Sequence, residues 1–178
     1  MSKDAYDRTI IVNGMSKAYA MTGWRIGYTI APAELAKVMA SYQSQATSNP
    51  CSVAQFASVE ALRGPQEDLK RMVGVFAERR KLMHSLLSAI PGVTCRLPQG
   101  AFYALPNISS TFGKSYKGEK ITGSVSFAEL LLRHKLCAVI PGAAFGADDN
   151  IRLSYAESIE DIKRGVARIA EFVSELED

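Results

Sequence analysis

Several features that would place a protein in a specialised class are scarce or missing in these 178 residues. No apolar run approaches the ~20 residues that a helix needs to cross a membrane, so the sequence argues against a membrane protein. The polar opening MSKDAYDRT has neither the apolar core nor the small-residue cleavage site of a secretory signal. We therefore expect no export.

Cysteine and histidine are also rare. The three cysteines, Cys51, Cys95 and Cys137, are odd in number, widely spaced and without a CxxC pair, whereas disulfide frameworks use paired cysteines in an oxidising compartment. His84 and His134 each lack a cysteine or acidic partner at the spacing of metal ligands. These residues favour reduced thiols in the cytoplasm and no metal site.

Charged residues of one sign do not cluster anywhere in the sequence. The 21 Lys and Arg residues nearly balance 18 Asp and Glu residues, and the net charge of +3 is spread out. The run ERRK at 78–81 lies within a helical pattern and is typical of a solvated helix face, not of a nucleic-acid site. The GKS at 113–115 lacks the first glycine of a P-loop, because Ile108 occupies that position.

What is present is the composition of an ordinary globular protein, 47% apolar and 22% charged. Residues 8–14 and 24–31, rich in β-branched and aromatic side chains, predict two strands that flank a loop. A helical pattern follows from Ala33 to about Ala46, breaks at TSNP (47–50), and resumes from about Ser52 to Leu62.

The rest of the chain predicts a second, mixed α+β unit. The longest amphipathic segment runs from Pro65 to Ile90 and predicts a helix of six or seven turns. The last helix is marked by the SIED cap at 158–161 and a stripe of apolar residues at threes and fours. Between them we expect two short strands around the turn Pro98–Gly100, a loop over 111–123, a helix at about 126–134, and strands over 136–142 and 150–156.

The segment SKAYAMTGWRIGY (16–28) carries the chemistry. A free lysine, with a pKa near 10.4, is neutral in only about one molecule in two thousand at pH 7, so it is a poor nucleophile or base. An imine between Lys17 and an aldehyde cofactor such as pyridoxal phosphate removes that limit, and the amine that substrate releases then lies where protons move. The guanidinium of Arg25 and the hydroxyl of Ser16 are suited to the cofactor's phosphate.

Three motifs together resemble one family. SKAYAMTGWRIGY is similar to the lysine signature of class I pyridoxal-phosphate-dependent aminotransferases. Its residues most resemble those of bacterial aspartate aminotransferases. PQGAFY (98–103) and IRLSYA (151–156) stand in the order and at the distances found in the C-terminal half of that family. The resemblance therefore covers essentially the whole chain.

The resemblance implies a role for each candidate residue. It makes Lys17 the catalytic residue that forms the imine and moves protons, and Ser16 and Arg25 ligands of the cofactor phosphate. It makes Arg152 the arginine that pairs with the substrate's α-carboxylate, against the alternative of a structural salt bridge on a strand. We expect Trp24, beside Arg25, to pack in a core. The TSNP segment is expected near the interface of a homodimer.

The resemblance also implies the fold. We expect the α/β architecture of fold type I pyridoxal-phosphate-dependent transferases, here only its end: residues 1–63 as the C-terminal remnant of the large cofactor-binding domain, and 64–178 as the connecting helix and the small α+β domain. The family's partner of the pyridine nitrogen and the ring stacked on the cofactor are absent from this stretch. We therefore expect a truncated chain that is inactive alone.

Three functions stay open at this point. The first is an aminotransferase that moves an amino group between an amino acid, aspartate by resemblance, and a 2-oxo acid. The second is a pyridoxal-phosphate lyase of the same fold, such as aminocyclopropane-carboxylate synthase, which shares the lysine and the arginines. The third is a fragment without catalysis that serves as a binding or assembly module.

Overall fold

The computed structural model describes residues 3–178, and the chain divides into two compact units, Met1–Arg71 and Met72–Asp178. The division falls within one helix, α4 (Glu67–Ser88). The domain boundary after residue 63 concerns the domains of a larger protein and stays a prediction. Of the helices in the described residues, none combines the length and apolar character that crossing a bilayer requires.

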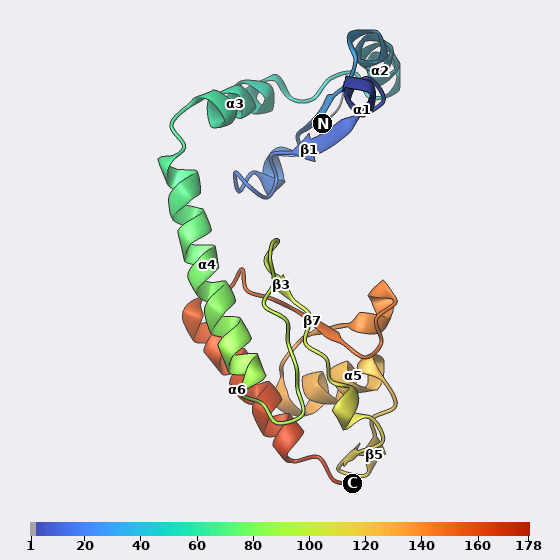
Figure 1. The fold of residues 1–178 in the computed structure, drawn as a ribbon, viewed down its shortest axis with the longest axis vertical. Coiled ribbons are helices and arrows are strands. Elements are labelled where there is room, and N and C mark those ends of the chain that lie inside the picture. The colour runs from blue at the N-terminus through green and yellow to red at the C-terminus, as the bar shows by residue number, and fades with distance from the viewer. Residues whose placement is uncertain (1–2) are drawn as a thin grey trace. The chain divides into compact units, whose positions relative to one another are not determined.

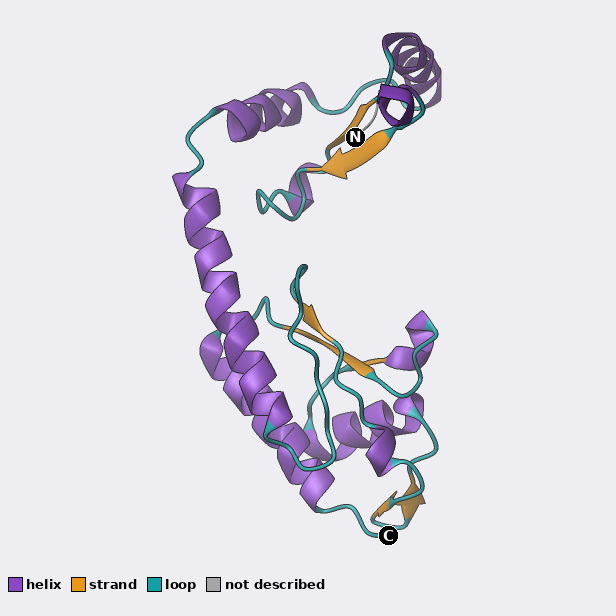
Figure 2. Ribbon diagram, viewed as in Figure 1, coloured by secondary structure: helices purple, strands orange, loops and turns teal. Residues whose placement is uncertain are grey.

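In the first unit, the short helix α1 (Lys3–Asp7) is followed by an antiparallel hairpin (Figures 1 and 2). Strand β1 (Ile11–Gly14) pairs with β2 (Gly27–Ile30), with Ile11 opposite Ile30 and Gly14 opposite Gly27. Both predicted strands exist, but β2 begins later than expected because Trp24 belongs to a 3₁₀ turn, η1 (Thr22–Trp24). The loop that connects the two strands is therefore longer than predicted.

Two helices complete the first unit, α2 (Ala33–Ala46) and α3 (Ser52–Arg63). Their separation at TSNP is confirmed: the amide of Thr47 makes the last helical bond, to the carbonyl of Gln43 at 3.0 Å, and Pro50 has no amide hydrogen to extend the pattern. Within the described residues α2 buries no side chain, and α3 buries only Ala54 and Ser58.

The second unit contains a three-stranded antiparallel sheet in the order β3-β7-β6 (Figure 2). Its strands are β3 (Tyr103–Ala104), β6 (Ile140–Pro141) and β7 (Ile151–Ser154). The register pairs Tyr103 with Ser154 and Ile140 with Arg152, so β7 is central and Arg152 lies at its middle. A 3₁₀ turn, η3 (Gly142–Phe145), connects β6 to β7.

Three helices cover this unit's core: the C-terminal part of α4, α5 (Ser124–Lys135) and α6 (Ile159–Ser174). Leu87, Phe127 and Ile169 are each fully buried within one cluster. Of the apolar stripe predicted for α6, Ile162, Val166 and Ile169 are buried, whereas Ile159 at the start of the helix is 38% exposed. Phe172 is also fully buried. Side-chain burial at every third or fourth position holds this helix on the core.

The start of α6 follows the sequence signal closely. The hydroxyl of Ser158 accepts a hydrogen bond from the amide of Asp161 at 3.0 Å, which satisfies one of the amides that the first helical turn leaves without a partner. The same hydroxyl donates to the Asp161 carboxylate at 2.8 Å. The predicted cap is therefore present, and the Ser158 hydroxyl both accepts from and donates to Asp161.

The strand predictions between the helices are too long. Of the strand predicted over 136–142, only Ile140–Pro141 pairs with β7, because Leu136 turns the chain out of α5 in a left-handed conformation with φ 50°. Of two strands predicted around Pro98–Gly100, only β3 forms. The predicted loop over 111–123 contains a small hairpin, β4 (Ser115–Tyr116) with β5 (Glu119–Lys120), preceded by the turn η2 (Ser109–Thr111).

Candidate active site

The loop that carries Ser16, Lys17 and Arg25 is closed at its base by the hairpin. Gly14 and Gly27 are register partners, and the amide of Met15 donates to the carbonyl of Ile26 at 3.3 Å. A Cβ atom at position 27 would lie 2.9 Å from the carbonyl oxygen of Asn13. The absence of a side chain at position 27 therefore lets the two ends of the loop approach each other.

Ser16 and Lys17 follow directly on this closed base. Ser16 is half-buried, and its hydroxyl has no hydrogen-bond partner among residues 3–178. Lys17 is exposed, and its carbonyl accepts a hydrogen bond from the amide of Ala20 at 3.2 Å, which starts a turn immediately after the lysine. The buried side chain of Met15, 1% exposed, anchors the entry to this turn. The lysine side chain is thus presented from an anchored backbone.

Arg25 lies at the other end of the loop, where η1 ends. Its backbone is left-handed, with φ 51° and ψ 50°, which costs a residue with a side chain on the order of 1–3 kcal/mol. Its Nη1 donates to the carbonyl of Thr22 at 3.0 Å. This bond fixes the guanidinium from one side, and the remaining N–H groups stay available for an anion.

An open hollow of about 560 Å³ lies beside Arg25. It is lined by Ala20, Gly23, Trp24, Arg25, Cys51 and Ala54. Trp24 is 46% exposed, so the expectation that it packs in a core is wrong for the described chain. The indole belongs to η1, which directs it to the rim of this hollow and not into a sheet face.

Four of the six non-glycine residues with left-handed backbone in residues 3–178 lie in the lysine loop, TSNP and PQGAFY. Among residues 3–178 this conformation occurs at Ala20, Arg25, Ser48, Ala101, Lys117 and Leu136. The first two are in the lysine loop, Ser48 is in TSNP, and Ala101 is in PQGAFY. Such strain persists where the surrounding structure imposes it, and it is frequent at functional sites. The conformation therefore supports a functional interpretation of these segments.

Arg152 belongs to the second unit, on the central strand β7. Its guanidinium carbon lies 4.4 Å from the ring centroid of Tyr103 and 4.4 Å from that of Phe145. Within residues 3–178 it has neither an ion pair nor a hydrogen bond to a side chain, so the salt-bridge alternative has no partner there. Phe145 was not singled out from the sequence, because nothing in GAAFG marks an aromatic ring for an arginine seven positions later.

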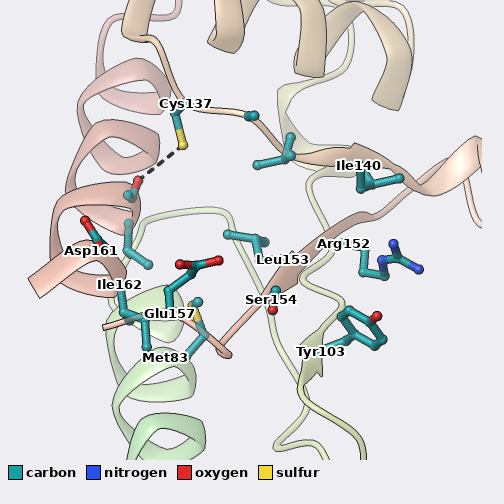
Figure 3. A pocket seen from close by; sticks show the side chains of 14 residues that line it. Met83, Tyr103, Cys137, Ile140, Arg152, Leu153, Ser154, Glu157, Asp161 and Ile162 are labelled. Carbon is teal, nitrogen blue, oxygen red and sulfur yellow. Dashed lines mark hydrogen bonds between the residues drawn. The ribbon is translucent and has the colours of Figure 1, made fainter. Parts of the chain in front are cut away.

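A hollow of about 250 Å³ adjoins this arginine. Figure 3 shows Arg152 and Tyr103 together on one side and Cys137, Asp161 and Met83 on the other. Cys137 directs its thiol to the carbonyl of Gly165 at 3.7 Å, and burial raises the pKa of this thiol. The thiol is therefore held in its neutral form, and the charged groups of the hollow are Arg152 on one side and Glu157 and Asp161 on the other.

Solved structures and curated sequences of aminotransferases are similar to this chain. The crystal structure of the aspartate aminotransferase from Rhizobium meliloti matches with a TM-score of 0.92 at 47% identity, over 97% of this chain and 43% of that one. An aspartate/prephenate aminotransferase of Cereibacter sphaeroides is 52% identical over 172 residues, 96% of this chain and 43% of the relative. An aspartate aminotransferase of Rhizobium meliloti is 49% identical over 165 residues, 92% of this chain and 40% of the relative.

These likenesses define part of an α/β aminotransferase of fold type I, as the motifs had led us to expect. Residues 2–169 match the family described as Aminotransferase class I and II, and the chain belongs to this family. It spans about 43% of the length of the relative from Cereibacter sphaeroides. The relatives are named as aminotransferases, so the lyase alternative is not favoured.

Proposed function

We propose that this chain supplies part of the active site of a pyridoxal-phosphate-dependent aminotransferase, which transfers the amino group of aspartate to a 2-oxo acid. The observation that carries the proposal is the lysine loop: Lys17 and Arg25 lie on one segment closed by the β1–β2 hairpin, with Arg25 in a strained left-handed backbone. Membership of the aminotransferase family supports the same reaction.

The donor groups of the loop fit the cofactor. Pyridoxal phosphate, when bound, supplies an aldehyde for the amino group and a ring that withdraws electrons from the substrate's α-carbon. Lys17 offers a primary amine to the aldehyde. The Ser16 hydroxyl, without a partner among residues 3–178, and the N–H groups that Arg25 does not use on Thr22 are suited to a phosphate.

Each of the candidate site residues has its own role in the proposed reaction. The Nζ atom of Lys17 would hold the cofactor, and as a free amine it would move a proton to and from the substrate. Arg25 and Ser16 would anchor the phosphate and so keep the cofactor in place independently of Lys17. Arg152 receives the α-carboxylate of the substrate through paired N–H groups.

The substrate and the assembly are inferred from the relatives. Aspartate is the substrate in the names of both curated relatives, and the one from Cereibacter sphaeroides is also named for prephenate. We infer that the whole enzyme is a cytoplasmic homodimer. Three free cysteines, Cys51, Cys95 and Cys137, support a reducing compartment.

Covalent trapping tests the cofactor site. The 178-residue chain is incubated with pyridoxal phosphate and reduced with borohydride, and the modified peptide is identified by mass spectrometry. We expect the adduct on Lys17 and its loss in Lys17→Arg, whereas Lys37→Arg, on the exposed face of α2, keeps it. Labelling spread equally over surface lysines would contradict the proposal and favour a binding or assembly module.

An activity assay tests the reaction itself. We expect no appreciable transamination of aspartate by this chain alone, because it spans about 43% of the relative from Cereibacter sphaeroides. The intact enzyme of Rhizobium meliloti, assayed in parallel with aspartate, serves as the reference for turnover. Turnover by the chain that matches the reference would overturn the expectation that further parts of the site are needed. Product analysis would also detect a lyase.

A further inference from the structure

The surroundings of Arg152 differ from those of other arginines in the second unit. Arg133 pairs with Glu119 at 2.8 Å, Arg164 pairs with Asp161, and Arg168 donates to the carbonyl of Leu136 at 2.8 Å. Arg152 instead has two aromatic rings beside its guanidinium, each with its centroid 4.4 Å from the guanidinium carbon, and it has no ion-pair partner within residues 3–178. The cation is thus contacted by two rings, while its N–H groups have no hydrogen-bond or ion-pair partner in the described chain.

Three segments that are distant in sequence build this arrangement. Tyr103 on β3 is the register partner of Ser154, two residues from Arg152, so both side chains lie on the same face of the sheet as diagonal neighbours. Figure 3 shows the tyrosine ring beside the guanidinium. Phe145 comes from η3, the turn that leads into β7. The first ring is therefore fixed by sheet register and the second by a turn.

The turn that carries Phe145 is itself tightly held. A Cβ at Gly142 would lie 2.1 Å from the carbonyl oxygen of Ala147, so the turn closes only without a side chain there. The amide of Ala143 donates to the Ser124 hydroxyl at 3.1 Å, and that hydroxyl donates to the carboxylate of Asp148 at 2.6 Å. These contacts tie the turn to the start of α5. Although Phe145 is 50% exposed, its backbone has little freedom.

Stacked rings restrict a guanidinium in a particular way. They attract the cation through their π faces and cover both of its flat sides. The N–H groups point outward within the plane, and they remain able to donate. A carboxylate that approaches in this plane can accept two parallel bonds, whereas an approach from above or below is blocked.

We propose that Tyr103 and Phe145 are positioning residues that hold the Arg152 guanidinium edge-on to the carboxylate of the substrate. The inference rests on the proposed function, because it takes Arg152 as the carboxylate receptor. The two rings fix the plane of the arginine before the substrate arrives, so less side-chain freedom is lost on binding. Removal of either ring should weaken carboxylate binding about 3- to 10-fold while Arg152 itself is present.

Nuclear magnetic resonance of the 178-residue chain tests this inference directly. The Nε–Hε signal of Arg152 is observed during titration with 2-oxobutyrate, a simple 2-oxo acid. In the parent chain we expect an upfield ring-current shift of this signal and a saturable response to the acid. Tyr103→Leu and Phe145→Leu should each reduce the ring-current shift and raise the dissociation constant about 3- to 10-fold.

Conservative variants and a matched control separate positioning from general damage. Tyr103→Phe and Phe145→Tyr keep a ring and should retain the shift and the affinity. Leu132→Ala removes a side chain of similar exposure, 51%, from α5 without touching the arginine, and it should leave both quantities unchanged. A chain whose amide spectrum matches that of the parent is folded, and Phe145→Leu is expected to meet this criterion because the ring is half exposed.

Two results would overturn the inference, and they can be told apart. If both leucine variants bind 2-oxobutyrate as tightly as the parent chain, Arg152 keeps its proposed role and the two rings have no part in it. If the parent chain itself gives no response at Arg152, the proposed carboxylate role fails, and the positioning role fails with it. Loss of binding in the leucine variants, with binding retained in the ring-keeping variants, supports the inference.

Discussion

The helices of both units carry apolar residues, but the two units bury them very differently. In the second unit, one cluster buries side chains from α4, α5 and α6, and Leu87, Phe127 and Phe172 are fully inaccessible. In the first unit, α2 buries no side chain within the described residues, and Tyr42 and Phe56 are 76% and 78% exposed. Burial of apolar surface is the main favourable contribution to folding.

The difference bears on how the two parts of the proposed site are held. Arg152 is on a strand at the centre of a sheet that packs on its own core, so sheet register and core packing position it. Lys17 and Arg25 are on a loop whose geometry comes from backbone pairing at its base and from turns within it. The position of Arg152 therefore depends on tertiary packing, and that of the lysine loop depends mainly on local backbone structure.

The largest expected effect comes from matched phenylalanines in the two units. Phe127 is fully buried and meets the ring of Phe172 edge-on at 5.1 Å, so Phe127→Ala should lower the free energy of unfolding of the second unit by about 3 to 5 kcal/mol. Phe56→Ala removes an exposed ring and should change stability by less than about 0.5 kcal/mol. Urea denaturation measures both. Equal losses would contradict the contrast between the units.

A pair of glycines gives the next largest difference. Gly142→Ala places a Cβ 2.1 Å from the carbonyl oxygen of Ala147 and should cost about 1 to 3 kcal/mol. Gly23→Ala, in the lysine loop, meets nothing within 4 Å and should be neutral within about 0.5 kcal/mol. Thermal unfolding compares the two variants. A Gly142→Ala chain as stable as the parent would show that η3 is less tightly closed than its contacts indicate.

Helix caps provide a smaller test. Ser158→Ala removes the oxygen that accepts from the Asp161 amide and should destabilise the second unit by about 1 kcal/mol. Neither α2 nor α3 has a side-chain cap at its start, where Pro32 and Cys51 stand. Cys51→Ser supplies a capping hydroxyl and should slow amide hydrogen exchange in the first turn of α3. Unchanged exchange there would mean that this helix start is already fixed by other contacts.

The smallest effect at neutral pH is expected for an acidic residue of the second unit. Hydrogen bonds from the side chain and backbone of Ser124 lower the pKa of Asp148, and bonds from Lys135 and Tyr116 lower the pKa of Glu175. Because these carboxyl groups bind protons more weakly in the folded state, their stabilisation is present above about pH 4 and is lost as pH falls through the lowered values.

Asp148→Asn tests this pH dependence, because asparagine keeps an acceptor oxygen for Ser124 but cannot titrate. We expect a small loss of stability at pH 7, where the ionised carboxyl contributes, and a flatter loss of stability below pH ~4. Glu129→Gln, on the exposed face of α5, is the control. Circular dichroism against pH at fixed urea measures the three chains. An unchanged acid transition in Asp148→Asn would remove Asp148 from the groups responsible.

Local patterns predicted the helices well and the strands poorly. The helix over Ala33–Ala46 and the capped start of α6 follow from periodicity, a proline and a serine, all of which act within a few residues. The strand predicted over 136–142 is observed only at Ile140–Pro141, because only these residues pair with β7. Strand length depends on a partner, and a single sequence does not reveal which partner is in reach.

The candidate site divides along the same line. The sequence alone determined the chemistry offered by Ser16, Lys17 and Arg25, because these residues belong to one continuous loop and form a recognisable sequence motif. It also marked Arg152 as a cation on a strand. Only the tertiary structure decided what surrounds that cation: β3 brings Tyr103 from 49 positions away and η3 brings Phe145, so that each ring centroid lies 4.4 Å from the guanidinium carbon. Such stacking is a product of sheet register and turn closure, which no local pattern in this sequence encodes.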